Sequence, residues 1–159
     1  DLVRSRGLGD VYKRQYLESK IFSADPVELV QILYRAALEA VGAARRHLAR
    51  GDVAARSQEI SRAMAVLTEL MLSVDREAGG PLAYNLLELY DYMQRRLIEA
   101  NAEQTETPLA EVGRLLATLL DGWMHCRHAA DGAAETEEAD CAAPVLSGSY
   151  PSAYSQLSV

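Results

Sequence analysis

Helix start and stop signals divide the middle of the chain, and their spacing constrains the fold more than any other feature. Asp25-Pro26 is typical of an acidic N-cap followed by proline at the first helical position. Gly51-Asp52 ends one helix and caps the next, Gly79-Gly80-Pro81 interrupts the chain again, and Thr107-Pro108 opens a last helix. We therefore expect helices at about 26–50, 52–75, 81–104 and 107–128.

Each expected helix carries apolar residues along one face, and no stretch shows the period-two alternation of a strand. The four apolar stripes are Val30, Leu33, Ala37, Val41, Ala44 and Leu48; Ile60, Met64, Leu67, Met71 and Val74; Leu82, Leu86, Leu89, Met93, Leu97 and Ala100; and Leu109, Val112, Leu116, Leu119 and Trp123. Short turns force consecutive helices to alternate in direction. The sequence thus predicts an all-α fold, an antiparallel up-and-down four-helix bundle.

Composition and charge exclude several classes of function. The chain of 159 residues is 49% hydrophobic and 25% charged, as expected for one globular domain. Its net charge of −7 argues against nucleic acid, whose phosphates require clustered Lys and Arg. Cys126 and Cys141 make no disulfide framework, which favours a reducing cytosol. No uninterrupted apolar run approaches the roughly 18 residues of a membrane span, and no secretory signal is evident.

The two ends of the chain differ from its middle. Residues 1–15 are rich in Gly and Arg, and GDVYKRQ resembles translated adaptor sequence more than a natural N-terminus, so we treat 1–15 as a leader without function. From 129 to 159 the composition shifts to Ala, Glu, Ser, Pro and Tyr without periodicity, which predicts a disordered acidic tail. The expected domain is therefore 16–128.

The third helix carries more apolar surface than one core contact requires. At about 100° per residue, its stripe covers an arc of about 80°, and further apolar residues extend the arc to about 200°. These additional residues are Tyr84, Leu87, Tyr90 and Ile98. Two interpretations are open: the whole arc is core between two neighbouring helices, or part of it is a shallow groove for an amphipathic segment of another protein.

Several motifs resemble the family of the flagellar secretion chaperone FliS. Tyr16-Leu-Glu-Ser-Lys-Ile21, then Ser23-Ala-Asp-Pro-Val-Glu-Leu29 and Leu33-Tyr34, are similar to the family's opening. Val74-Asp-Arg-Glu-Ala-Gly-Gly80 and Leu89-Tyr-Asp-Tyr-Met-Gln-Arg-Arg-Leu-Ile-Glu-Ala-Asn101 are the more specific part of the match. The residues that carry it are Asp25, Pro26, Leu33, Tyr34, Gly79, Gly80, Leu89, Tyr90, Asp91, Met93, Arg95, Arg96, Leu97 and Asn101.

The resemblance implies a cytoplasmic export chaperone. Such a protein would bind the C-terminal segment of flagellin, prevent its early polymerisation and deliver it to the flagellar type III export gate, without a cofactor. The segment around Tyr16 would act as a lid over the client groove. The expected client contacts are Tyr16, Ile21, Tyr84, Leu87, Tyr92 and Ile98. Met64, Met71 and Met93 would adapt to the client.

Further interpretations concern charged residues and other partners. Asp91, Arg95 and Arg96 either order neighbouring helices by ion pairs or form a solvated face. Asp121, His125 and His128 are candidate metal ligands near the end of the fourth helix. Di-iron bundles, however, place a Glu three residues before a ligand His, and no His of this chain has such a Glu. We therefore expect neither metal nor enzyme activity. The alternative function is an adaptor that binds regulatory partners or pairs as a homodimer when empty, with flagellin irrelevant.

Overall fold

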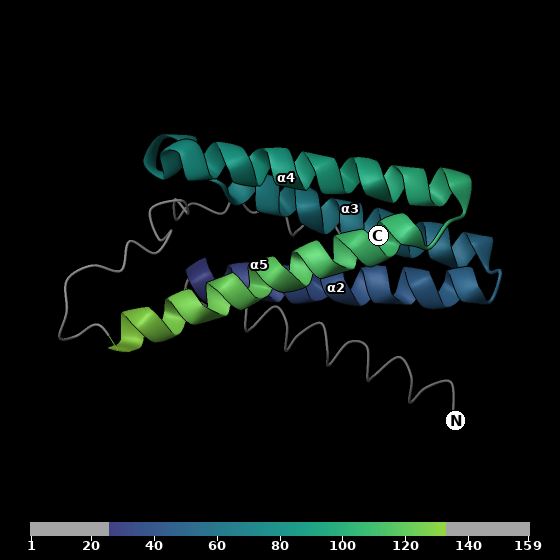
Figure 1. Cartoon of the computed structure of the whole chain (residues 1–159), viewed down its shortest axis with the longest axis horizontal. Helices are drawn as coiled ribbons and strands as arrows, with labels where there is room; N and C mark the ends of the chain where they lie inside the picture. Colours follow the sequence, from purple (N-terminus) through teal and green to yellow (C-terminus); the bar gives the residue numbers. More distant parts are fainter. Residues whose placement is uncertain (1–25, 133–159) are drawn as a thin grey trace, which may run out of the picture.

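The fold is a bundle of four long helices (Figure 1). The computed structural model describes residues 26–132. The surroundings of the side chains are described for residues 26–126. The helices are α2 Pro26–Ala49, α3 Val53–Ser73, α4 Arg76–Glu103 and α5 Thr107–Gly132. Because α3 and α5 each pack against both α2 and α4, the latter two lie diagonally across the bundle. The predicted antiparallel four-helix fold is confirmed. The expected leader and lid, with Tyr16, Ile21 and Asp25, and residues 133–159 of the expected tail lie outside the described residues.

The start and stop residues expected from the sequence agree with the boundary between the first two helices. α2 is described from Pro26 onward, and Gly51 takes the left-handed conformation (φ 71°) after the helix ends. A Cβ would make this conformation unfavourable, which explains the glycine. Asp52 then caps α3, because its side chain accepts a hydrogen bond of 3.1 Å from the backbone N–H of Ala55.

The break before the third helix was only partly predicted. A short helical turn begins at Arg76, capped by Asp75, whose Oδ1 accepts bonds from Glu77 N (2.9 Å) and Ala78 N (3.0 Å). The chain kinks at Gly80, where φ 50° and ψ −133° form a conformation open essentially to glycine alone. The straight part of α4 then starts at Pro81. At the other end, α5 runs to Gly132 and not to about 128.

The core is built from the predicted faces of α2, α3 and α5, but the buried face of α4 is rotated from the prediction. Leu82, expected in the core, is 46% exposed, whereas Tyr90, expected on the outer arc, is 2% exposed. The fully or nearly buried residues of α4 are Ala83, Leu86, Tyr90, Met93, Leu97 and Ala100. The predicted inner placement of Leu82 was therefore wrong, whereas Tyr90 follows the interpretation in which the wider arc belongs to the core.

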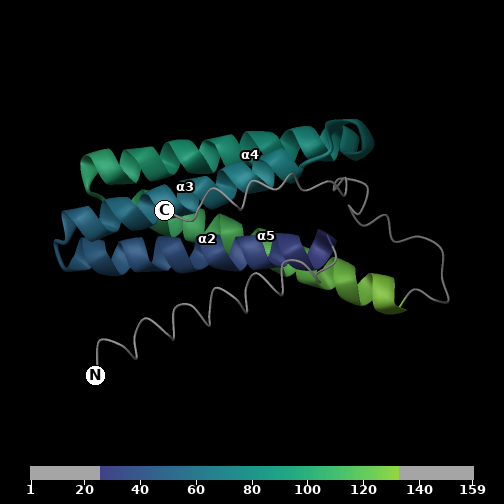
Figure 2. The same ribbon diagram turned by 180° about the vertical axis from the view of Figure 1, so that it is seen from behind.

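The lengthwise packing of α4 and α5 is uneven. Figures 1 and 2 show α5 crossing the bundle obliquely, close to α4 near their connection and farther from it toward Gly132. Leu82 lies in the first turn after the kink, at the divergent end, which explains its exposure. Within residues 26–132, no helix combines the length and the hydropathy that a membrane span requires.

A polar cluster joins three helices inside the core. The hydroxyl groups of Tyr34 in α2 and Tyr90 in α4 lie 2.5 Å apart, and Trp123 Nε1 of α5 donates to the Tyr34 hydroxyl at 3.3 Å. Gln31, also buried, donates through Nε2 to the backbone carbonyl of Trp123 at 3.5 Å. Burial raises the pKa of both tyrosines, so they stay protonated. The cluster fixes the spacing of α2 and α4 across the bundle diagonal.

The cluster predicts unequal costs for two similar substitutions. Tyr34→Phe leaves both Tyr90 and Trp123 without a partner and is expected to cost about 2–3 kcal/mol of unfolding free energy, whereas Tyr90→Phe costs about 1 kcal/mol. The double variant should cost less than the sum, because both hydroxyl groups are removed together. Urea denaturation of the three variants checks this; equal single costs that simply add would show that the hydroxyl groups are energetically independent.

Candidate functional site

The outer side of α4 exposes large apolar side chains next to α3. Tyr84 is 63% and Ile98 53% exposed, and Leu87 is half-buried. Their side of the helix is fixed by Gln94, whose Nε2 donates to Thr68 Oγ1 (2.9 Å) and to the carbonyl of Met64 (3.2 Å), both in α3. At about 100° per residue, Leu87, Ile98 and Tyr84 lie about 20°, 40° and 80° from Gln94 toward solvent.

Leu72 of α3 extends this apolar surface. It is the most exposed large hydrophobic residue of the described chain, at 73%. Leu72 lies about six residues beyond the level at which Gln94 contacts α3, and Leu87 lies seven residues before Gln94 on the antiparallel α4. At about 1.5 Å per residue, Leu72 and Leu87 are therefore within roughly 2 Å of the same height along the bundle. We call Leu72, Tyr84, Leu87 and Ile98 the α3–α4 strip.

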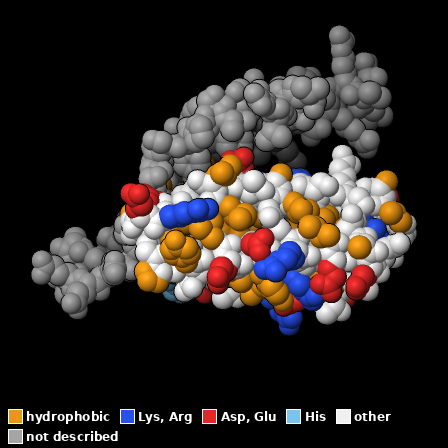
Figure 3. All heavy atoms as spheres, turned by 90° about the horizontal axis from the view of Figure 1, so that it is seen from above, with side chains coloured by type: hydrophobic (Ala, Val, Ile, Leu, Met, Phe, Trp, Pro, Cys, Tyr) orange, Lys and Arg blue, Asp and Glu red, His pale blue; other side chains and the backbone are white. Residues whose placement is uncertain are grey.

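The strip lies among charged residues. Figure 3 looks onto the α4 side of the molecule and shows several groups of hydrophobic side chains between acidic and basic ones. Asp91 and Arg95, on the outermost face of α4, form an ion pair of 2.7 Å with each other. This pair lies within one helix, so the proposed ordering of neighbouring helices does not apply to it. The pair keeps the surface beside the strip charged and hydrated. It adds little to stability, because exposed pairs of this kind stabilise a helix by only about 0.3–0.5 kcal/mol.

Tyr92 lies on the opposite edge of α4, facing α5. Its hydroxyl donates to Glu111 Oε1 at 2.6 Å, and Arg96 Nε donates to Glu111 Oε2 at 2.8 Å. Arg96 also pairs with Glu99 at 2.5 Å. Arg96 thus joins two helices, as one interpretation of the charged trio expected. The structure does not bring Tyr92 together with Tyr84, Leu87 and Ile98.

The Tyr92–Glu111 bond changes the acid–base behaviour of this edge. The hydrogen bond from Tyr92, followed by the one from Arg96, holds the pKa of Glu111 below its ordinary value of 4.5, and the bond to Glu111 raises the pKa of Tyr92. Because the folded state lowers this carboxyl pKa, ionised Glu111 stabilises the fold above its unfolded pKa. The contribution is lost as pH falls through the folded-state pKa.

Replacing Glu111 by Gln should therefore weaken the acid dependence of stability. We expect the melting temperature of Glu111→Gln to fall less than that of wild type between about pH 5 and pH 3, since the variant has no carboxylate to protonate there. Thermal melts over this range check the result, with the exposed Glu88→Gln as a control. Parallel curves for wild type and Glu111→Gln would contradict a stabilising role of the carboxylate.

Most of the family-motif residues are structural in this fold. Leu33, Tyr34, Tyr90, Met93 and Leu97 are buried, and Leu89 is partly buried against the same core. The predicted client-adapting role of Met93 is therefore wrong, because its side chain is 0% exposed. Met64 and Met71 are partly buried.

Asn101 ties the end of α4 to the start of α3. Its Oδ1 accepts bonds from Ser57 Oγ (2.9 Å) and from the buried Arg56 (3.3 Å through Nη2), while its carbonyl accepts a second bond from Arg56. Gln104, in the left-handed conformation, ends the helix and also accepts from Arg56. Asn101 therefore has a structural explanation.

The suspected metal residues do not assemble a site in the part of the chain with described side chains. Asp121 and His125 are both exposed and lie one turn apart on α5, with 3.5 Å between Asp121 Oδ1 and His125 Nδ1. The side chain of His128 lies outside the described residues. No group of three His, Cys, Asp or Glu residues close enough to bind a metal is present among the described residues.

Sequence comparisons agree with this architecture. The family model described as "Flagellar protein FliS" matches residues 9–130. The chain is 38% identical to the flagellar secretion chaperone FliS of Salmonella typhimurium over 70% of this chain and 84% of the relative. It is 34% identical to the flagellar secretion chaperone FliSB of Pseudomonas aeruginosa, over 74% and 93%. It is 28% identical to FliS of Bacillus subtilis, over 68% and 80%.

The family model covers all of the described bundle except its last two residues, including α4 and the part of α3 that together carry the strip. The Salmonella relative matches over most of its own length as well. On both grounds the chain belongs to the FliS family of flagellar proteins.

Proposed function

We propose that this chain is a cytoplasmic flagellar export chaperone that binds the C-terminal segment of flagellin on the α3–α4 strip. In this role it keeps flagellin from polymerising early and presents it to the export gate. The observation that carries the proposal is the strip itself, apolar side chains exposed on two adjacent helices of a well-packed bundle. The names of the relatives support the same function.

The physical basis is competition for an apolar stripe. A flagellin segment that self-associates through an apolar face can cover that face on the chaperone instead. Covering the exposed parts of Leu72, Tyr84 and Ile98, each more than half exposed, would contribute roughly 1 kcal/mol per side chain from apolar burial. Folding of a disordered client on binding costs about 2–5 kcal/mol, so the complex stays reversible. Reversible binding suits a client that must be released for export.

The core supports this function by remaining intact when the strip is occupied. Residues directly beside the strip, such as Leu97 and Leu86, belong to the core, and Gln94 holds α4 against α3 by hydrogen bonds. A client that covers only the outer face of these helices therefore need not open the bundle. The expected chemistry is binding alone, with no bond made or broken.

A binding experiment with truncated client tests the proposal. The purified full chain is titrated by calorimetry with monomeric flagellin and with flagellin that lacks its C-terminal segment. We expect binding only to the full-length client, and a delay of filament growth when chaperone is added to full-length flagellin. Equal binding of both clients would contradict the proposal. A strip occupied by a second copy of the chain, with no flagellin binding, would instead support the dimerising adaptor.

A further inference from the structure

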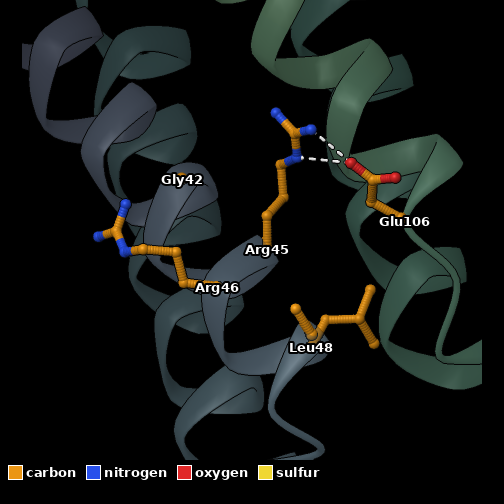
Figure 4. Close-up of a pocket in the computed structure, with 6 residues that line it drawn as sticks. Gly42, Arg45, Arg46, Leu48 and Glu106 are labelled. Carbon is orange, nitrogen blue, oxygen red and sulfur yellow. Dashed lines mark hydrogen bonds and ion pairs between the residues drawn. The ribbon is translucent and has the colours of Figure 1, made fainter.

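The C-terminal end of α2 forms a shallow basic hollow that shares no residue with the strip. Its volume is about 670 Å³. The lining residues are Gly42, Arg45, Arg46, Leu48, Ala49 and Glu106. All but Glu106 come from α2, and Glu106 reaches in from the turn before α5 (Figure 4). Gly42, Arg45 and Ala49 follow one line of the helix, and Arg46 and Leu48 flank that line on either side. None of these residues belongs to the α3–α4 strip.

The two arginines of the hollow are in different states. Arg45 reaches across to Glu106 and forms an ion pair with it, in which Arg45 Nε donates at 3.0 Å (Figure 4). Both side chains of that pair are about half exposed, so it is worth only about 0–1 kcal/mol and can exchange. Arg46 extends away from the pair and has no ion pair or hydrogen bond among the described side chains.

Gly42 leaves room for the Arg46 side chain. A Cβ built at Gly42 would lie 3.4 Å from Arg46 Nη1, so the guanidinium lies back along α2 over the glycine. Arg50 follows one turn later, also exposed. Residues 45–50 thus bring three arginines together in a chain whose net charge is −7. A guanidinium with free donors binds carboxylates by paired hydrogen bonds.

We propose that this hollow binds an acidic peptide segment of a partner protein, with carboxylates on Arg46 and Arg45 and an apolar side chain over Leu48. The charge of the hollow is complementary to such a segment, and the apolar floor favours a peptide over a nucleic acid. The hollow is separate from the flagellin site, so this surface gives the chaperone a second partner.

The acidic segment of this chain is too short to span the hollow as far as Glu106 in cis. Residues 135–140 contain four carboxylates. They follow Gly132, the end of α5, whereas the hollow lies at the beginning of α5 beside Glu106. The 26 residues of α5 span about 39 Å, and eight extended residues reach at most about 29 Å. Reaching Glu106 in cis would take more chain than these residues supply, so we assign the occupant to a partner chain.

Fluorescence anisotropy with a labelled peptide tests the proposal. The probe is a ten-residue peptide with four glutamates around one central leucine, and its control has glutamine at the four positions. We expect the acidic probe to bind the full chain, with affinity that falls as salt screens the charges. Arg46→Glu should weaken binding at least about tenfold, whereas Arg76→Glu, the same charge change at the opposite end of the bundle, should not.

A second variant separates the hollow from its charge alone. Gly42→Leu keeps every charge but fills the space beneath Arg46. We expect it to weaken binding of the acidic probe at least about fivefold, while the far-ultraviolet circular dichroism spectrum stays unchanged. Ile98→Asp should leave probe binding intact, which makes the outcome independent of the flagellin site. Equal binding of the glutamine peptide, equal weakening by Arg76→Glu, no effect of Gly42→Leu, or tighter binding of a single-stranded oligonucleotide would each overturn the proposal.

Discussion

Leu97→Asp is expected to unfold the bundle, whereas the same change at the next residue, Ile98→Asp, should leave it folded. Leu97 is 0% exposed and Ile98 is 53% exposed. Cutting a buried leucine even to alanine costs about 2–5 kcal/mol, and a buried carboxylate adds a desolvation penalty, against a total stability of about 5–15 kcal/mol for a typical domain. Circular dichroism and thermal melts of the two variants give the comparison.

This pair is a matched test because both variants add the same charge to the same turn of α4. The expected result is loss of cooperative melting for Leu97→Asp and a melting temperature within a few degrees of wild type for Ile98→Asp. Similar melting of the two proteins would show that the division of α4 into core and strip is wrong.

Ile98→Asp and Leu72→Asp should each reduce flagellin binding by at least about tenfold while the bundle stays folded. Both side chains are exposed, so the substitution removes apolar contact area from the strip and places a charge against the apolar face of the client. The matched control is Val53→Asp, because Val53 is 48% exposed outside the strip. Calorimetric titration with full-length flagellin measures all three variants.

The control decides between two explanations of any loss. If Val53→Asp weakens flagellin as much as Ile98→Asp does, the added negative charge and not the strip is responsible. Leu87→Asp is a poorer probe, because Leu87 is half-buried and its replacement affects stability as well as contact.

Much of the fold could be predicted because the helix ends are marked by residues with specific backbone requirements. Gly51 and Asp52 occupy the positions that a left-handed glycine and a capping carboxylate prefer. The turn at Arg76–Gly79 was missed because a glycine pair reads as a break, whereas the cap at Asp75 supports one helical turn before the kink at Gly80.

The orientation of α4 could not be read from its pattern. An apolar arc of about 200° contains several possible centres, and only packing against α3 and α5 selects one. Tyr90 is drawn inward because Tyr34 offers its hydroxyl a buried partner across the bundle. Leu82 is left outside because α5 diverges from α4 at that end (Figure 1).

The candidate site was predicted in part for the same reason. Tyr84 and Ile98 were expected on the outer surface from helix geometry, and both are exposed. Leu72 was not predicted, because the residue pattern of α4 alone does not show which residue of α3 lies at the height of Leu87. The available signal was an apolar residue directly after the stripe residue Met71, on the face turned away from the core.

Site-specific photocrosslinking tests the central claim, that the α3–α4 strip is the client site, most directly. A photoreactive phenylalanine analogue replaces Tyr84 in one protein and Arg35, exposed on the diagonally opposite α2, in the other. The proposed site predicts crosslinks from position 84 to the C-terminal segment of flagellin, mapped by mass spectrometry, and none from position 35. Crosslinks of equal yield from both positions, or from position 35 alone, would contradict it.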